Sequence, residues 1–378
     1  MYSLAGYGEM IADDVRMSAY RDALRRAIRP GCVVIDLGAG AGIMACLAVR
    51  FGASRVYAIE PSDAIGVARE IAQANGLAER IRFIQDTSDH VELPERADIL
   101  VSDLRGVLPP YTGHFAAIGD ARRRLLKVGG KIIPALDTIW AAAVEAPELY
   151  ERQIKSWRDG EFNLAPGRWR MANIWSKARV RPEQLLTDAC LWATVDYRTV
   201  IEPAVRGSLT LGARRGGLAH GLALWFDAEL LDEIGFSNAP DHPEAIYGHA
   251  FFPFPEPTLL SPGDVLAITI RADFVESDYL WSWDTAIHQP DGTEVKSFRQ
   301  SEFHHLPLSA AKLRTRASSF TPTLNREGEI DGVVLSLFGT GQTLGDIAKD
   351  LATTFPDEFG DWKTALDRVA RLSAIYGA

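Results

Sequence analysis

Several features that would place the chain in a specialised class are scarce in its sequence. Only three cysteines occur among 378 residues, far apart and without a Cys-x-x-Cys spacing, so neither a disulfide framework nor a metal site is predicted. The sequence has no run of about 18 apolar residues that could span a membrane. Its first residues are acidic and lack the apolar core of a signal peptide. We therefore expect a cytoplasmic protein with no membrane partner.

Positive charge is also in short supply. The formal net charge is −10 and the isoelectric point is about 5.4, which argues against binding to nucleic acid through a broad basic surface. The composition, 47% hydrophobic and 24% charged, is that of an ordinary globular protein. The length predicts two or three domains.

Strands and helices alternate over the first third of the chain. The hydrophobic periodicity predicts helices at 13–28, 43–51, 64–75 and 116–126, and strands at 33–35, 55–59, 81–84, 97–102 and from 131 to 134. This alternation is typical of a parallel sheet with helices on its faces. We predict an α/β fold, with a Rossmann-like domain over residues 1–135.

After Pro134 the pattern changes to short apolar segments separated by turn residues, which predicts an antiparallel β-barrel or sandwich. We assign residues 136–315 to this domain. An insert at about 147–180, rich in tryptophan and charge, interrupts it. Residues 316–378 form a small helical module, in which Thr343 and Asp361 are predicted to cap two of three amphipathic helices.

A glycine-rich loop carries the clearest chemical signal. Gly38, Gly40 and Gly42 follow a predicted strand and precede a helix that begins at Ile43. Such glycines let the backbone approach a ligand closely. Asp36, two residues before the first glycine, would repel a pyrophosphate but would favour a ligand with a cationic amine or sulfonium. The loop therefore favours S-adenosylmethionine over a nicotinamide cofactor.

Carboxylates follow the later strands. Glu60, which precedes Pro61, ends the second strand, where an acid can accept hydrogen bonds from ribose hydroxyls. Ser88 and Asp89 follow the third strand, where adenine would lie. Asp103 follows the fourth. Because ligands bind beyond the carboxyl ends of parallel strands, we expect Asp103 near the reacting methyl group.

A longer set of motifs resembles the protein arginine methyltransferases, over roughly residues 7–303. The matching segments include Tyr7-Gly-Glu-Met10, Asp13-Asp-Val-Arg16, Val91-Glu-Leu-Pro94, Gly129-Gly-Lys-Ile-Ile-Pro134, His220-Gly221 and Trp225-Phe-Asp227. The resemblance implies a methyltransferase domain followed by a β-barrel, with the insert serving as the arm of a homodimer. It also implies that Arg16 binds the carboxylate of the cofactor's methionine part. The expected cofactor-binding residues are Tyr7, Met10, Arg16, Asp36, Gly38, Gly40, Gly42, Ile43, Glu60, Pro61, Ser88, Asp89 and Asp103.

The sequence departs from that family at its substrate-binding positions. Where the family has two glutamates, this chain has Asp103 and Thr112, and where the family has Thr-His-Trp it has Ala245-Ile246-Tyr247. Asp13 matches the acid that pairs with the missing histidine, so it is expected to lack this partner. Tyr7 replaces a histidine near the cofactor. The C-terminal module, outside this resemblance, is similar to PqqD-type winged-helix domains, which bind leader segments of ribosomally made peptides.

These observations lead to one main hypothesis and three alternatives. The main one is transfer of a methyl group to a nitrogen, or less favourably an oxygen, of a peptide or small metabolite. Asp103 and His249 are then the candidate catalytic groups. The first alternative is methylation of free or peptidyl arginine. The second is a regulatory protein that binds the cofactor without turnover, and the third is an NAD-dependent dehydrogenase.

Overall fold

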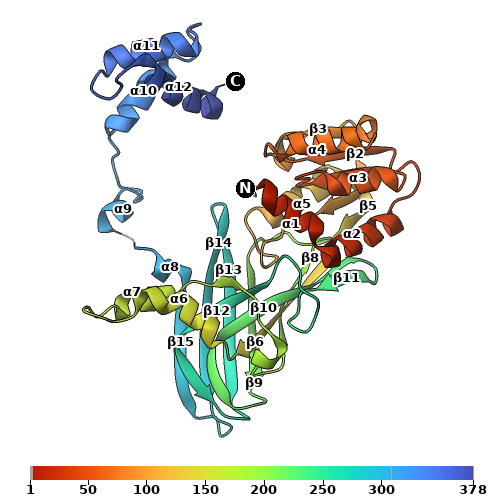
Figure 1. The fold of residues 1–378 in the computed structure, drawn as a ribbon, viewed down its shortest axis with the longest axis vertical. Coiled ribbons are helices and arrows are strands. Elements are labelled where there is room, and N and C mark those ends of the chain that lie inside the picture. Colours follow the sequence, from red (N-terminus) through yellow and green to blue (C-terminus); the bar gives the residue numbers. More distant parts are fainter. Residues whose placement is uncertain (1–2, 308, 378) are drawn as a thin grey trace. The chain divides into compact units, whose positions relative to one another are not determined.

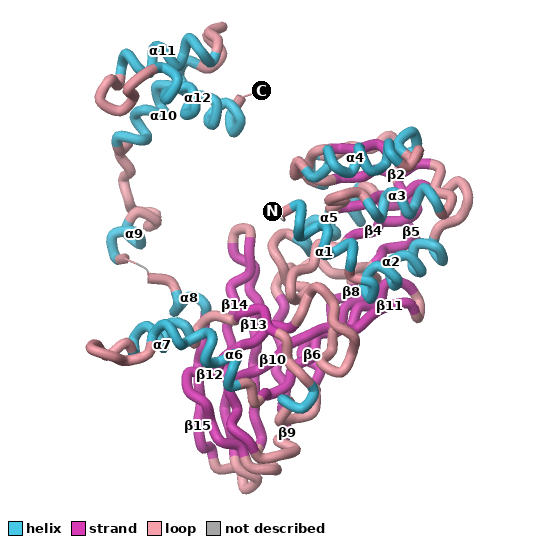
Figure 2. The backbone as a smooth tube through the Cα atoms, in the orientation of Figure 1, coloured by secondary structure: helices cyan, strands magenta, loops and turns pink. Residues whose placement is uncertain are grey.

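The computed structural model describes residues 3–307 and 309–377, in two compact units. The first reaches Leu306 and the second begins at Pro307. Within the first unit, helices cover a parallel sheet in the N-terminal part, and strands make up most of the rest (Figures 1 and 2). In the part of the chain that the structure describes, no helix is both long enough and apolar enough to cross a membrane.

A five-stranded parallel sheet forms the N-terminal domain, in the order β3-β2-β1-β4-β5. Its strands are β1 (Val33–Leu37), β2 (Arg55–Ile59), β3 (Ile81–Ile84), β4 (Ala97–Ser102) and β5 (Leu126–Ile133). All five residues of β1 are buried, because this central strand has neighbours on both edges and helices above and below. The predicted parallel sheet is confirmed.

Five helices accompany this sheet: α1 (Leu4–Ala12), α2 (Asp14–Ala27), α3 (Ile43–Arg50), α4 (Ala64–Ala74) and α5 (His114–Arg124). Helices α3 and α4 pack against strands β1 to β3, and α5 packs against β4 and β5. The sequence prediction was wrong at Leu126, which it placed in a helix. Leu126 is the first residue of β5, opposite Ala97, and the ladder is irregular between Ala97 and Ile99.

Two antiparallel sheets follow. One contains β7 (Ser176–Ala178), β12 (His249–Leu260), β10 (Gly217–Leu231), β6 (Leu136–Val144) and β8 (Cys190–Asp196), in that order, with β11 (Ile234–Ser237) paired to β10. The other contains β15 (Glu294–Ser301), β14 (Asp278–His288), β13 (Val265–Val275) and β9 (Val205–Gly212). The predicted antiparallel β domain is confirmed.

Strand β12 is hard to recognise from the sequence because it contains Pro253, Pro255 and Pro257. A proline cannot donate to a ladder, so it is tolerated at irregular positions of a strand. Here the pairing of β10 with β12 runs from Ala250 to Pro253, shifts register, and resumes at Thr258. The prolines therefore coincide with the irregular stretch.

The insert predicted at about 147–180 contains helices α6 (Pro147–Ile154) and α7 (Ala165–Met171), before β7. Three of its aromatic side chains, Trp157, Phe162 and Trp169, are exposed in the single chain. Helix α8 (Glu302–His305) ends the first unit and contacts α7.

The second unit holds α9 (Ala310–Arg314), α10 (Arg326–Leu337), α11 (Leu344–Thr354) and α12 (Trp362–Tyr376). Thr343 and Asp361 accept hydrogen bonds from the first turns of α11 and α12, as predicted. Val334, Leu351 and Val369 are completely buried between these helices. A winged helix requires a β-hairpin wing, and residues 309–377 contain no strand. The expected PqqD-type winged-helix architecture is therefore not supported.

Candidate active site

A cavity of about 460 Å³ lies at the carboxyl edge of the parallel sheet, where the loops after β1, β2 and β4 meet helices α1 and α2. Its walls include many residues that the sequence predicted together. The predicted residues that line it are Tyr7, Met10, Arg16, Asp36, Gly38, Gly40, Ile43, Glu60, Pro61 and Asp103.

The glycine loop curves around this cavity with left-handed backbone. The φ angles of Gly38 and Gly40 are +73° and +51°, a region that other residues adopt at a cost. A Cβ atom on Gly40 would stand 2.5 Å from the Tyr7 ring, which packs over the loop. Gly42 has a different role, because a Cβ there would meet Ala68 of α4 at 2.7 Å. It permits helix packing and is not among the lining residues.

Two buried carboxylates flank the loop. Glu60 accepts hydrogen bonds from the backbone N–H groups of Gly40 (3.0 Å) and Ser62 (2.9 Å), which fix its orientation. Asp36 accepts one hydrogen bond, from the N–H of Ala45 at 2.8 Å. Burial raises the pKa of Asp36 to about 7. A buried, incompletely satisfied carboxyl suits a cationic group, and hydrogen-bonded Glu60 suits hydroxyls, so the cavity fits the chemistry of S-adenosylmethionine.

Arg16 lies in the first turn of α2 and faces Asp103. Its Nε donates to Asp103 Oδ2 at 2.5 Å, and its Nη1 donates to the carbonyl oxygen of Met10 at 3.2 Å. The arginine expected to hold the cofactor carboxylate is thus placed at the cavity wall by two contacts within the chain.

Asp103 accepts hydrogen bonds from three side chains. Besides Arg16, Arg105 Nη1 donates to its Oδ1 at 2.9 Å and the Tyr247 hydroxyl donates to its Oδ2 at 2.7 Å. Burial alone would raise the pKa of Asp103, but the two guanidinium groups and the Tyr247 hydrogen bond outweigh it and hold that pKa at about 2. Asp103 is therefore ionised at neutral pH and is a weak base.

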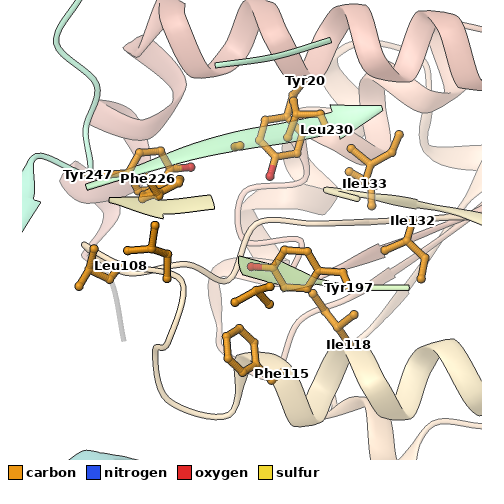
Figure 3. Packing of buried hydrophobic residues seen from close by; sticks show 14 of the residues in the cluster. Tyr20, Leu108, Phe115, Ile118, Ile132, Ile133, Tyr197, Phe226, Leu230 and Tyr247 are labelled. Atoms are coloured by element: carbon orange, nitrogen blue, oxygen red, sulfur yellow. The ribbon is translucent and has the colours of Figure 1, made fainter. Parts of the chain in front are cut away.

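Behind Asp103, Arg105 is bound on several sides. Its Nε and Nη2 donate to the two oxygens of Asp137, at 2.7 and 3.1 Å, and its Nη1 also donates to the Tyr20 hydroxyl. The Tyr197 hydroxyl donates to Asp137 at 2.6 Å. Figure 3 shows the hydroxyls of Tyr20, Tyr197 and Tyr247 directed into the same interior region.

Family models match both domains of the first unit. Residues 136–287 match the arginine methyltransferase oligomerization subdomain, and residues 21–108 match the ribosomal protein L11 methyltransferase family. Protein arginine N-methyltransferase 1 of Schizosaccharomyces pombe is 30% identical over 244 residues, which cover 61% of this chain and 71% of that protein. The chain belongs to the protein arginine methyltransferase family.

Other relatives agree with this assignment. The probable protein arginine N-methyltransferase 6 of Arabidopsis thaliana is 30% identical over 231 residues, and the match spans 58% of this chain and about half, 53%, of that relative. The structure of Arabidopsis protein arginine methyltransferase 10 has the same fold, with a TM-score of 0.71 and 22% identity over 79% of this chain and 97% of that one. The prediction of a methyltransferase is confirmed.

The structure locates the positions at which the sequence departs from the family motifs. Thr112, where the resemblance implies a second glutamate, lines the cavity with a left-handed backbone (φ 41°). Asp13 is not left unbonded, because its Oδ2 accepts the backbone N–H of Ile246 at 2.7 Å. This backbone bond ties the start of α2 to the 245–247 loop, although position 246 carries no histidine to pair with Asp13.

Besides Gly42, three predicted site residues are not among those that line the cavity. His249 is buried on β12: its Nδ1 accepts the N–H of Val180 at 2.8 Å, and its Nε2 is 2.7 Å from the Asn238 carbonyl. With both ring nitrogens bonded to backbone it cannot serve as a base for the cavity, and its candidacy is withdrawn. Ser88 and Asp89 are not among the lining residues, and their predicted contact with adenine stays a prediction.

Sequence reasoning missed Arg105 and Asp137. Arg105 is only two residues from Asp103, and Asp137 is the single charge in the strand Leu136–Val144. A charge within an apolar strand signals a buried partner, but the sequence does not say which residue provides it.

Proposed function

We propose that this chain is an S-adenosylmethionine-dependent N-methyltransferase that binds its cofactor in the cavity at the glycine loop. The observation that carries the proposal is the enclosure of the glycine loop, Glu60 and Asp103 in one cavity. When bound, the cofactor supplies an electrophilic methyl group on a sulfonium. A solved structure of similar fold, an arginine methyltransferase enzyme–prozyme complex from Trypanosoma brucei, contains S-adenosylhomocysteine. Its TM-score is 0.72, with 20% identity over 78% of this chain and 96% of that one.

Different residues around the cavity can bind different parts of the cofactor. Each oxygen of Glu60 accepts one backbone N–H and retains acceptor capacity for the ribose hydroxyls. Asp36 would hold the ammonium group. Arg16 has five N–H donors, so it can bind the cofactor carboxylate while its Nε keeps Asp103 in place.

The relatives' names support arginine as the acceptor. Proteins called arginine N-methyltransferases match about 60% of this chain, so arginine is the first acceptor to test. A second candidate is an uncharged nitrogen of a peptide or small metabolite. The bond between Arg105 and Asp103 favours it, because the carboxylate that would attract a guanidinium is already paired.

The part played by Asp103 follows from its hydrogen bonds. A carboxylate whose pKa is about 2 is a poor proton acceptor, so we assign it the orientation of the acceptor N–H and not general-base catalysis. Asp103 would direct the lone pair of the acceptor nitrogen toward the methyl group that the cofactor would supply. The proton released from nitrogen then passes to water. Alignment in a closed site supplies most of the rate enhancement in such a reaction.

We also propose that the chain forms a homodimer. The match to an oligomerization subdomain covers residues 136–287, which include the insert with its exposed Trp157, Phe162 and Trp169. Exposed aromatic side chains on one segment are typical of an interface.

Calorimetric titration with S-adenosylhomocysteine tests the cofactor assignment. We expect binding by the wild type and at least a tenfold weaker affinity in Glu60→Ala, because hydrogen bonds to a charged group contribute about 1.5–3 kcal/mol. The matched control is Glu79→Ala, which removes an exposed glutamate outside the cavity. Absence of binding by the wild type would refute the proposal.

Methyl transfer is then measured with labelled S-adenosylmethionine and arginine, an arginine peptide, and a peptide that carries an uncharged nitrogen nucleophile. Transfer to any nitrogen supports the enzyme. Tight cofactor binding with no transfer to any acceptor would instead support a regulatory protein that has kept the cavity.

A further inference from the structure

Four ionised side chains form a continuous buried cluster beside the cavity: Arg16, Asp103, Arg105 and Asp137. They alternate in sign, and the three contacts that join neighbours are 2.5, 2.9 and 2.7 Å long. The side chains of Arg105 and Asp137 are completely buried, and that of Asp103 is 7% exposed. The cluster as a whole carries two positive and two negative charges and is neutral.

Arg105 has hydrogen-bond partners on several sides within and beside this cluster. The guanidinium also lies 5.5 Å from the centre of the Phe226 ring and 5.8 Å from that of Phe236, on the β-sheet side. Arg105 does not line the cavity, whereas Asp103 does. Arg105 can therefore influence an acceptor in the cavity only through its effect on Asp103.

This arrangement compensates the negative charge that Asp103 would otherwise present to an acceptor. One oxygen faces Arg105, and the other receives Arg16 and Tyr247. Burying a cation requires a carboxylate whose charge is not already compensated. Thr112, which also lines the cavity, adds no charge. Of the remaining acids of the cavity, Asp36 and Glu60 are assigned to the cofactor above.

We propose that Arg105 is a specificity-determining residue that neutralises Asp103 from behind and restricts the acceptor to a nitrogen that is uncharged in the complex, such as an imidazole. This inference rests on the proposed methyl transfer and decides between its two acceptor classes. An uncharged nitrogen already has a free lone pair, so Asp103 needs only to accept its N–H, or that of a neighbouring group, and orient it. A guanidinium would have to share Asp103 with Arg16 and Arg105, which already occupy its two oxygens.

The test compares two acetylated, amidated peptides that differ only by arginine or histidine at one position. Single-turnover methyl transfer is measured for the wild type and for the double variant Arg105→Met with Asp137→Asn. The double change removes one positive and one negative charge, so no buried carboxylate is left unpaired, and methionine fills the space of the arginine stem. Arg105→Lys, which keeps the positive charge, is the matched control for the ratio of the two rates.

We expect the arginine-to-histidine rate ratio to be below one in the wild type and in Arg105→Lys, and to rise at least tenfold in the double variant. Thermal melting and affinity for S-adenosylhomocysteine verify that each variant is folded. If the double variant is folded, binds S-adenosylhomocysteine and shows no such rise, the inference is wrong. A wild type that prefers the arginine peptide also overturns it, while the proposed methyl transfer would stand. Failure of the wild type to bind S-adenosylhomocysteine would be the separate failure of the proposed function.

Discussion

Asp36 gives the sharpest energetic prediction, because it is a buried carboxyl group. Its pKa is about 7 against an ordinary value of 3.8, and its side chain faces Glu60, which raises that pKa further, and Arg16, which lowers it. Replacement by asparagine keeps an acceptor for the Ala45 N–H and removes the charge. We predict that Asp36→Asn stabilises the protein without cofactor and weakens cofactor binding.

The sign and size of the change in stability follow from the linkage between the protonation of Asp36 and folding. A carboxyl group whose pKa is raised by folding contributes stability below its unfolded pKa and loses it as the pH rises to the folded pKa. Between pH 5 and pH 7 Asp36 is ionised in the unfolded chain and largely protonated in the folded one. Each pH unit in this window costs the wild type about 1.4 kcal/mol. The stability advantage of Asp36→Asn should therefore grow by about 2–3 kcal/mol from pH 5 to pH 7 and level off above.

Urea unfolding at several pH values, followed by tryptophan fluorescence, measures this difference. Eight of the nine tryptophans lie in the first unit, and Trp362 lies in the second. Asp98→Asn is a control of opposite sign, because Lys127 and the Val33 N–H lower the pKa of Asp98 despite its partial burial. A constant stability difference between wild type and Asp36→Asn across this pH range would refute the reasoning, and so would a less stable Asp36→Asn at pH 8.

Two further outcomes are expected. In sedimentation velocity at micromolar concentration the chain should have the mass of a dimer, and Trp169→Ala in the exposed insert should shift it toward the monomer; a wild-type monomer would contradict the proposed dimer. In the second unit, Leu351→Ala should lower the free energy of unfolding of that unit by about 2–5 kcal/mol, because it leaves a cavity among α10 to α12. The same variant should bind S-adenosylhomocysteine as the wild type does, and a loss of that affinity would show that the two units are coupled.

Patterns along the chain were sufficient for the elements that depend on local chemistry. Strands β2, β3 and β4 begin and end where the apolar runs do. The caps Thr343 and Asp361 were identified correctly because a capping side chain bonds to a backbone group only three residues away. The position of the cavity could also be predicted, since loops that follow parallel strands must meet at one edge of the sheet.

What the sequence could not show was where long-range partners lie. Both ring nitrogens of His249, the expected base, are bonded to backbone groups of Val180 and Asn238, which are 69 and 11 residues away. Strand β12, with its prolines, is recognisable only through its pairing with β10.

The fold class, the position of the cofactor cavity and the methyltransferase family could all be predicted from the sequence, because each rests on short-range patterns and motif order. The electrostatic state of Asp103 could not be predicted in this way, because tertiary contacts determine it. Asp103 reads as a free acid in the sequence, but folding brings Arg16 and Arg105 to its two oxygens. The electrostatic state of this buried group depends on neighbours up to 144 residues away in the chain, and no local pattern encodes it.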